Sequence, residues 1–207
     1  MWTPTLQVAA ASSPERFAVV VADPDLDDPF SILLEYNARS PQAWQRIDIE
    51  REIVSLCYRP AMREGAMPVL MALSNEGDVC TTTAEGVSRS VIPGAGLAGP
   101  GGRGQTWAIC SSPEQIVVGG DGAQLYISCD GECWEAVPMV GAVEGITPRT
   151  RVVAVAELAG GDAALLCRSD PPPAFQPGAL QDGMSIEDMM AVIEANQAGQ
   201  QGRAATH

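Results

Sequence analysis

The segment 116–134 constrains the fold of this chain more than any other stretch of its sequence. It begins with the apolar run from Ile116 to Val118, passes through a Gly-Asp-Gly turn, and enters a second apolar run from Leu125 to Ile127. A polar turn follows and ends at Trp134. Short apolar runs separated by glycine-rich turns are typical of β-strands joined by hairpins. The segment therefore predicts two antiparallel strands and a further turn that a tryptophan closes.

Self-similarity at a fixed period indicates a repeat architecture, and this chain shows it. A similar turn of seven residues, 38–44, ends at Trp44, which lies 90 positions before Trp134. A four-stranded propeller blade takes about 40–50 residues, so this distance fits two blades. The same order of strand, turn, strand and turn recurs in 69–92 and in 152–170, and a first copy begins at Phe17. These runs predict four blade-like repeats.

The pattern Ser128-x-Asp130-Gly131-x-x-Trp134 resembles the Asp-box turn of bacterial β-propeller repeat proteins, of the sialidase type and the photosystem-assembly-factor type. The resemblance is specific over residues 116–134 and extends as a weaker pattern over the other copies. It implies a β-propeller and gives the turn a structural role without chemistry. The remaining short strand runs, 52–58 and 106–110, would complete the sheets. An ordinary β-sandwich with two tryptophan turns is the alternative.

Each residue of this turn has a physical reason to be there. The carboxylate of Asp130 can accept backbone N–H groups across the loop, and Gly131 can take the positive φ of a tight turn. The indole of Trp134, like that of Trp44, can cover the sheet. We therefore expect Ser128, Asp130, Gly131, Trp134 and Trp44 to be structural turn residues, with no catalytic residue among them.

The chain beyond the repeats predicts a different element. The proline-rich run 171–177 ends the β region, so we expect a propeller-like domain over 1–180 and a helix with a disordered tail over 181–207. Ser185 is a suitable N-cap and Gly199 ends the helix. Its apolar stripe, at i, i+3, i+4 and i+7 spacing, is expected to bind a partner or pack on the β domain. The stripe consists of Ile186, Met189, Met190 and Ile193.

Composition excludes several classes of function. The chain has no lysine, its single histidine is His207, and its net charge is −14. Lysine chemistry and histidine-based triads are therefore excluded, and the negative charge argues against binding a nucleic-acid backbone. No apolar run is long enough to insert into a membrane, and the N-terminal segment is a poor secretion signal, so we expect a cytoplasmic protein.

The sequence contains only weak candidates for a metal or a cofactor, and we expect neither. Cys129 and Cys133 lack a second pair at finger-like spacing. The acidic segment Asp23–Asp28 lacks the glycine and the distal glutamate of a calcium loop. The loop 99–106 lacks the lysine of a phosphate-binding loop. The six cysteines are expected to be reduced thiols, mostly in strands.

These observations favour a non-enzymatic interaction protein, which acts as a scaffold, an assembly subunit or an inhibitory acidic binder. Four repeats form a small propeller, and open sheet edges are templates for pairing, so we expect a protein partner or self-association. The alternative is a module that binds a small molecule, a glycan or calcium through loops at one end of the sheets, including 23–28 and 94–104. A propeller-type hydrolase is a third hypothesis, which the missing lysine and histidine argue against.

Overall fold

The computed structural model describes residues 5–22, 31–61, 65–83, 85–95, 104–158 and 162–169. Within these ranges the protein is all-β and consists of fourteen strands with no helix. The described part of the chain contains no helix able to cross a membrane. The predicted domain boundary at residue 180 lies outside the described residues.

The strands form four antiparallel sheets in which neighbours in sequence are neighbours in space. The first sheet contains β1 (Thr5–Ser13), β2 (Arg16–Ala22), β3 (Ser31–Asn37) and β4 (Trp44–Ile47). The second contains β5 (Ile53–Arg59), β6 (Val69–Ser74), β7 (Asp78–Thr83) and β8 (Gly86–Val91). The third contains β9 (Thr106–Ser111), β10 (Ile116–Gly120), β11 (Leu125–Ser128) and β12 (Glu135–Ala136). The fourth contains β13 (Thr150–Glu157) and β14 (Ala163–Ser169).

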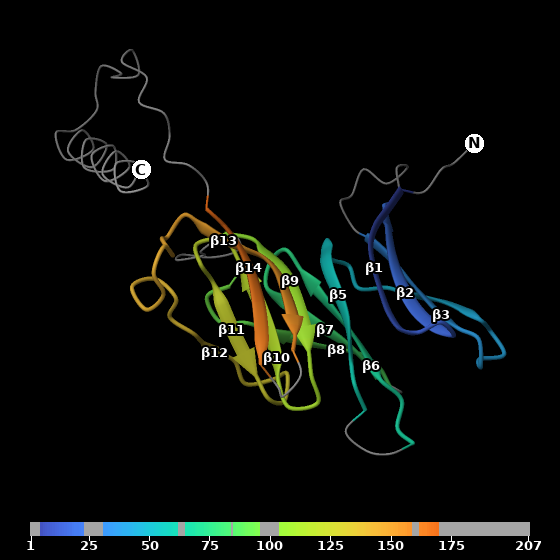
Figure 1. Ribbon diagram of the computed structural model, residues 1–207. Coiled ribbons are helices and arrows are strands. Elements are labelled where there is room, and N and C mark those ends of the chain that lie inside the picture. Colours follow the sequence, from blue (N-terminus) through green and yellow to red (C-terminus); the bar gives the residue numbers. More distant parts are fainter. Residues whose placement is uncertain are drawn as a thin grey trace, which may run out of the picture. The chain divides into compact units, whose positions relative to one another are not determined.

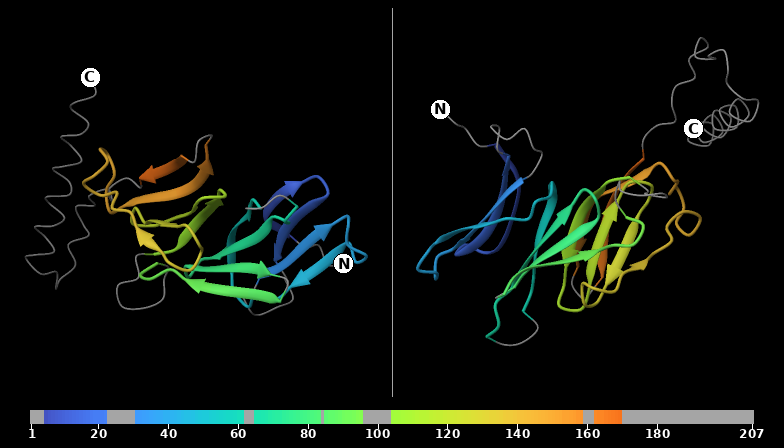
Figure 2. Two further views of the ribbon diagram at one scale, coloured as in Figure 1. Left: turned by 90° about the horizontal axis from the view of Figure 1, so that it is seen from below. Right: turned by 180° about the vertical axis from the view of Figure 1, so that it is seen from behind.

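The sheets pack face to face in chain order, which makes the fold propeller-like (Figures 1 and 2). The first strands of the sheets lie side by side: β1 contacts β5, β5 contacts β9, and β9 contacts β13. One hydrophobic cluster fills each junction between consecutive sheets, around Leu33 and Leu70, around Leu73 and Val118, and around Val152. A sandwich of two sheets, the alternative from the sequence, does not describe this series.

Strands in the middle of the series are buried on both faces, and their sequences show why. In β10 all five residues are buried, and in β6 every residue after Val69 is buried. A strand covered on both faces needs a continuous apolar run instead of alternation. At Gly119 the third and fourth sheets approach each other closely: a Cβ there would lie 2.7 Å from the Cβ of Val152.

The predicted repeats correspond to sheets, with two differences. The runs 52–58 and 106–110 are β5 and β9, which complete the second and third sheets as expected. In the second sheet β7 and β8 are joined by a tight turn in place of the seven-residue turn seen elsewhere. The segment 116–134 begins with β10, the second strand of its sheet, whereas 152–170 begins in β13, the first strand of its sheet. The sequence alignment of these two segments is therefore shifted by one strand. The strand pattern alone could not reveal this shift, because both segments are apolar hairpins.

Candidate interaction surfaces

The turn between β11 and β12 is closed by short-range hydrogen bonds around Asp130. Its Oδ1 accepts the backbone N–H groups of Glu132 and Cys133, each at 2.8 Å, and the Ser128 hydroxyl at 3.0 Å. The N–H of Gly131 donates to Ser128 Oγ at 2.8 Å, with Gly131 at a φ of +88°. The hydrogen bonds from Cys133, Glu132 and Ser128 lower the pKa of Asp130 to about 2, so the carboxylate is charged at neutral pH.

This turn also joins the third sheet to the second. The half-buried ring of Trp134 packs on the hydrophobic cluster of that junction, and its Nε1 donates to Ser90 Oγ at 2.9 Å. From the end of β5, Arg59 Nη2 donates to the carbonyl oxygen of Cys129 at 2.6 Å. Both hydrogen bonds connect the turn of the third sheet to the second sheet, which is a structural role.

The corresponding turn of the first sheet, before Trp44, uses weaker acceptors. Ser40 stands four residues before Trp44, as Asp130 stands four residues before Trp134, and its hydroxyl accepts the N–H of Gln42 at 3.3 Å. The Trp44 ring packs against two rings of its own sheet, edge-on to Phe17 with centroids 5.5 Å apart and tilted to Tyr36 with centroids 5.2 Å apart. Trp44 remains 47% exposed because no described sheet precedes the first one.

The first sheet packs on the second sheet with one face, and no described sheet packs on its other face, where among the large apolar side chains Val21 is buried and only Trp44 is exposed. Its inward face, including Ala18, Val20 and Leu33, packs on the second sheet. Alternation and the strand register place a second apolar set on the opposite face. None of its members belongs to a hydrophobic cluster of the described residues. We name this set the outer face, and it consists of Phe17, Val19, Val21, Ile32, Leu34, Tyr36 and Trp44.

Sequence reasoning placed Trp44 in the turn but missed the outer face. The available signal is that β2 and β3 are apolar at nearly every position from Phe17 to Leu34 in the described ranges, as in a strand covered on both sides. The sequence does not reveal which face lacks a cover, because that depends on the position of the sheet in the series.

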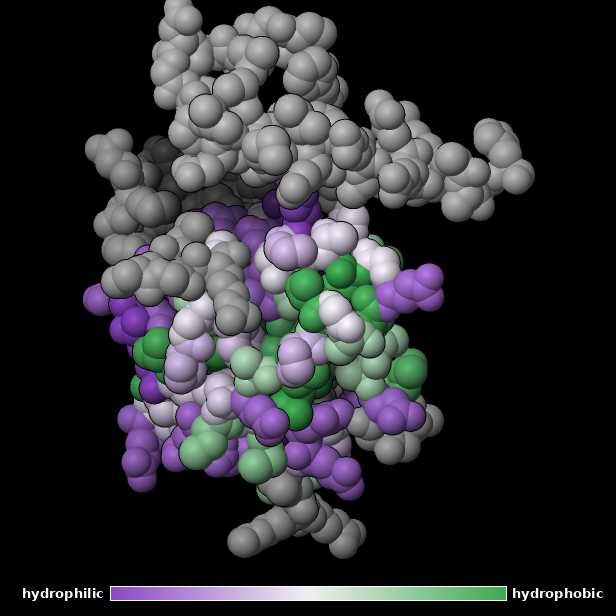
Figure 3. Space-filling model, turned by 90° about the vertical axis from the view of Figure 1, so that its left-hand side faces the viewer, coloured by the Kyte–Doolittle hydropathy of each residue, from purple (hydrophilic) through white to green (hydrophobic). Residues whose placement is uncertain are grey.

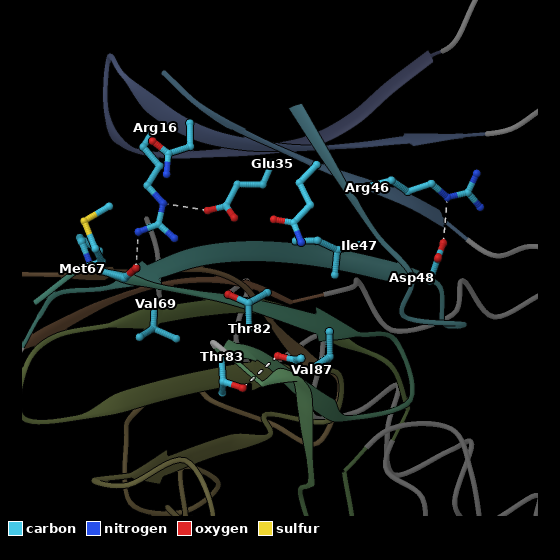
Figure 4. Close-up of a pocket in the computed structure, with 14 residues that line it drawn as sticks. Arg16, Glu35, Arg46, Ile47, Asp48, Met67, Val69, Thr82, Thr83 and Val87 are labelled. Carbon is cyan, nitrogen blue, oxygen red and sulfur yellow. Dashed lines mark hydrogen bonds and ion pairs between the residues drawn. The ribbon is translucent and has the colours of Figure 1, made fainter. Parts of the chain in front are cut away.

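A cleft of about 530 Å³ lies between the first and second sheets (Figure 4). Arg16 and Glu35 reach into it from the first sheet, and Thr82, Thr83 and Val87 line it from the second. Carboxylate, guanidinium, hydroxyl and aliphatic groups therefore line the same cavity. Such a mixture suits a small polar ligand.

The ion pair at the base of this cleft connects the two sheets. Arg16 Nε lies 2.9 Å from Glu35 Oε1, with 14% and 10% of the side chains exposed. Tyr58, in β5, donates its hydroxyl to the same oxygen at 2.9 Å, and Arg16 Nη1 donates to the carbonyl of Pro68 at 2.6 Å. Burial and the neighbouring Glu35 raise the pKa of Tyr58, so its hydroxyl stays protonated and continues to donate.

A second cavity, of about 570 Å³, adjoins the 128–134 turn. Its lining includes Cys129, Cys133, Trp134 and Glu114. The charge of Asp130 raises the pKa of the Cys133 thiol, which disfavours the thiolate that a metal would need. Across the described ranges, no three histidine, cysteine, aspartate or glutamate residues are grouped to hold a metal ion.

All six cysteines are free thiols, and they differ in environment. Burial raises the pKa of Cys57 to about 12 and that of Cys110 to about 11. Cys129 and Cys133, in the turn, are exposed. The strand thiols therefore act as small core side chains.

Exposed apolar residues also occur beyond the first sheet. Val140 and Val143 lie in the segment between β12 and β13 and are exposed. Figure 3 shows the molecule from the left-hand side of Figure 1, where this segment lies. Hydrophobic residues gather there in a patch bordered by hydrophilic ones. A gathered apolar patch is typical of a surface that contacts another molecule.

Several residues singled out in the sequence lie outside the described residues. These include the partner-binding stripe of the predicted C-terminal helix, the acidic segment 23–28 and most of the loop 94–104. The stripe consists of Ile186, Met189, Met190 and Ile193.

No protein-family model matches the chain, and no curated protein matches it. Among solved structures, the chain is similar to the computationally designed protein Ika4, with 12% identity over 80% of this chain and 92% of that chain, at a TM-score of 0.47. YCF48 from Cyanidioschyzon merolae matches at 12% identity over 82% and 51%, with a TM-score of 0.49. PorZ, an essential bacterial surface component of the type-IX secretion system of Porphyromonas gingivalis, matches at 10% identity over 78% and 18%, with a TM-score of 0.44.

The matched region is therefore about half of the YCF48 chain and less than a fifth of the PorZ chain. The propeller-like fold of the present chain rests on its own sheet topology and packing order.

Proposed function

We propose that this protein is a non-enzymatic interaction subunit, a scaffold or assembly platform that binds a protein partner through the outer face of its first sheet. The observation that carries the proposal is an aromatic group, the exposed Trp44 with the half-buried Phe17 and Tyr36, on a sheet face that no described sheet covers. Large aromatic side chains supply much of the binding energy in protein interfaces.

The turns are part of the same proposal. The 128–134 turn is interpreted as an Asp-box-like device of a β-propeller repeat, with the role of joining sheets. The predicted helix at 185–198 is proposed as a second contact element, with methionines that adapt to a partner surface. The net charge of −14 favours a partner with a basic surface, including a cationic protein that this chain would neutralise.

The test uses the full chain as bait in cells of its source, with native mass spectrometry of the purified material. The wild type and the control Val91→Ser, which changes an exposed valine of β8 outside the cleft lining, should be recovered in a complex heavier than the 21.7 kDa chain. Trp44→Ser should be recovered at 21.7 kDa. Recovery of Trp44→Ser in the same complex would contradict the proposed surface.

The cleft between the first and second sheets supports a second candidate, a binding module for a small polar molecule. A ligand in this cleft should raise the midpoint of thermal unfolding of the wild type. It should leave the midpoint of Val87→Trp unchanged, because the larger ring fills the cleft. A ligand library that shifts both proteins equally, or neither, contradicts binding at this cleft.

A further inference from the structure

The fourth sheet, like the first, has a face that no described sheet covers. Val152, Val155, Leu165 and Cys167 point toward the third sheet. Alternation along β14 makes Ala164, Leu166 and Arg168 point the opposite way, and Leu166 is 63% exposed. Past the register shift between Val152 and Ala154, the partners Ala154 and Ala156 lie on the same side as Leu166 and Ala164. We name this set the far face, and it consists of Ala154, Ala156, Ala164, Leu166 and Arg168.

The terminal sheets have the sequence pattern of interior ones. β13 is apolar from Val152 to Ala156 and β14 from Ala163 to Cys167, as β6 and β10 are where both faces are buried. A strand with one solvated face normally alternates apolar and polar residues. The sequences of the first and fourth sheets are therefore typical of sheets buried on both faces, yet another described sheet packs on only one face of each.

The two uncovered faces also share an absence of negative charge. Among the described residues, the members of the outer face and of the far face include no aspartate or glutamate. The far face carries Arg168, and Arg46, the register partner of Leu34, is ion-paired with Asp48 at 2.8 Å just past the end of β4. Two copies of a chain with a charge of −14 could therefore bring these faces together without opposing carboxylates.

We propose that the partner of the outer face is a second copy of this chain, whose far face packs on it. This inference rests on the proposed function and names the partner of the same surface. Within the chain, each sheet packs one of its faces on the sheet that comes next in the sequence. The contact between copies continues this established packing, last sheet onto first sheet. Two copies can make the contact twice and thereby cover all four faces.

Light scattering after size exclusion tests the proposal with the full chain. The wild type should have twice the 21.7 kDa mass of one chain, and the control Val91→Arg, at an exposed valine of β8 outside the cleft lining, should match it. Trp44→Arg and Leu166→Arg should each be monomers, because each removes one partner of the contact. An equimolar mixture of these two variants should regain dimers, because each variant keeps the face that the other lacks.

The alternatives give different results. If Leu166→Arg remains a dimer while Trp44→Arg is a monomer, two first sheets pair with each other and the last-to-first contact is wrong. A monomeric wild type at all concentrations also overturns the inference, yet the proposed function survives if the wild type still forms a complex with another protein. Circular dichroism and thermal unfolding check that each variant is folded, and the milder Trp44→Ser replaces Trp44→Arg if the arginine variant is not.

Discussion

Two tryptophan turns of this chain show how single residues set the strength of a local network. Asp130 accepts two backbone N–H groups with one charged oxygen at 2.8 Å, whereas Ser40 accepts one at 3.3 Å. Hydrogen bonds to a charged acceptor are shorter and stronger than those to a neutral one. The Asp130 turn therefore holds its tryptophan on the neighbouring sheet more firmly than a serine turn would.

The depressed pKa of Asp130 predicts an acid dependence of stability. The folded pKa is about 2 and the ordinary value is 3.8, so the carboxylate stabilises the folded state above 3.8, and this contribution is lost as the pH falls toward 2. Asp130→Asn cannot titrate. The thermal midpoint of the wild type should exceed that of Asp130→Asn at neutral pH, and the gap should close near pH 2. A constant gap across this range would contradict the turn network.

Gly119 predicts a steric effect at the junction of the third and fourth sheets. A Cβ at this position would lie 2.7 Å from the Cβ of Val152, closer than unbonded carbon atoms approach. Gly119→Ala should lower the free energy of unfolding by about 1–3 kcal/mol through overpacking. Urea unfolding of the wild type and of Gly119→Ala measures this difference in free energy. An unchanged stability for Gly119→Ala would mean that the sheets do not pack this closely.

At the scale of elements, the junctions between sheets differ in chemistry. The junction of the second and third sheets is held by apolar packing with hydrogen bonds from Trp134 and Arg59. The junction of the first and second sheets adds the ion pair of Arg16 and Glu35, almost out of contact with water. Burying the two charges costs desolvation free energy, so the pair adds little net stability. Removing only one member leaves the other charge buried without a partner, which is strongly destabilising.

This predicts a non-additive mutant cycle. Arg16→Met leaves the Glu35 carboxylate buried and should cost about 3–5 kcal/mol of unfolding free energy. The double variant Arg16→Met with Glu35→Leu should cost less than the single one, because no charge remains. The exposed pair of Arg39 and Glu15, with 77% and 58% of the side chains accessible, is the control and should cost below about 1 kcal/mol. Additive losses in urea unfolding would contradict a coupled buried pair.

For the whole molecule, the net charge of −14 sets how it associates. Two identical copies repel one another at long range, whereas a basic partner is attracted. Salt screens both effects over a distance of about 10 Å at 0.1 M.

The sign of the salt dependence therefore separates the two kinds of partner. If the outer face takes a second copy, raising the ionic strength should lower the Kd of self-association, measured by analytical ultracentrifugation. A complex with a basic protein should instead weaken with salt. Self-association that weakens with salt would contradict an apolar contact between two acidic copies.

The fold class could be predicted from the chain alone because it depends on local patterns. Short apolar runs and glycine turns determined antiparallel strands, and the Ser128 to Trp134 pattern located a turn whose hydrogen bonds lie within a few residues of Asp130. The shift of the fourth repeat by one strand could not be predicted, because an apolar hairpin has the same pattern at either position in a sheet.

Only the tertiary structure decided which apolar faces are covered. Val118 and Val19 both stand in continuous apolar strands, yet Val118 lies between two sheets and Val19 belongs to the outer face. Trp134 and Trp44 close equivalent turns, and one ring packs on a preceding sheet while the other has none to pack on. The physical reason is that hydrophobicity is a property of a residue, whereas burial depends on which element the chain places beside it.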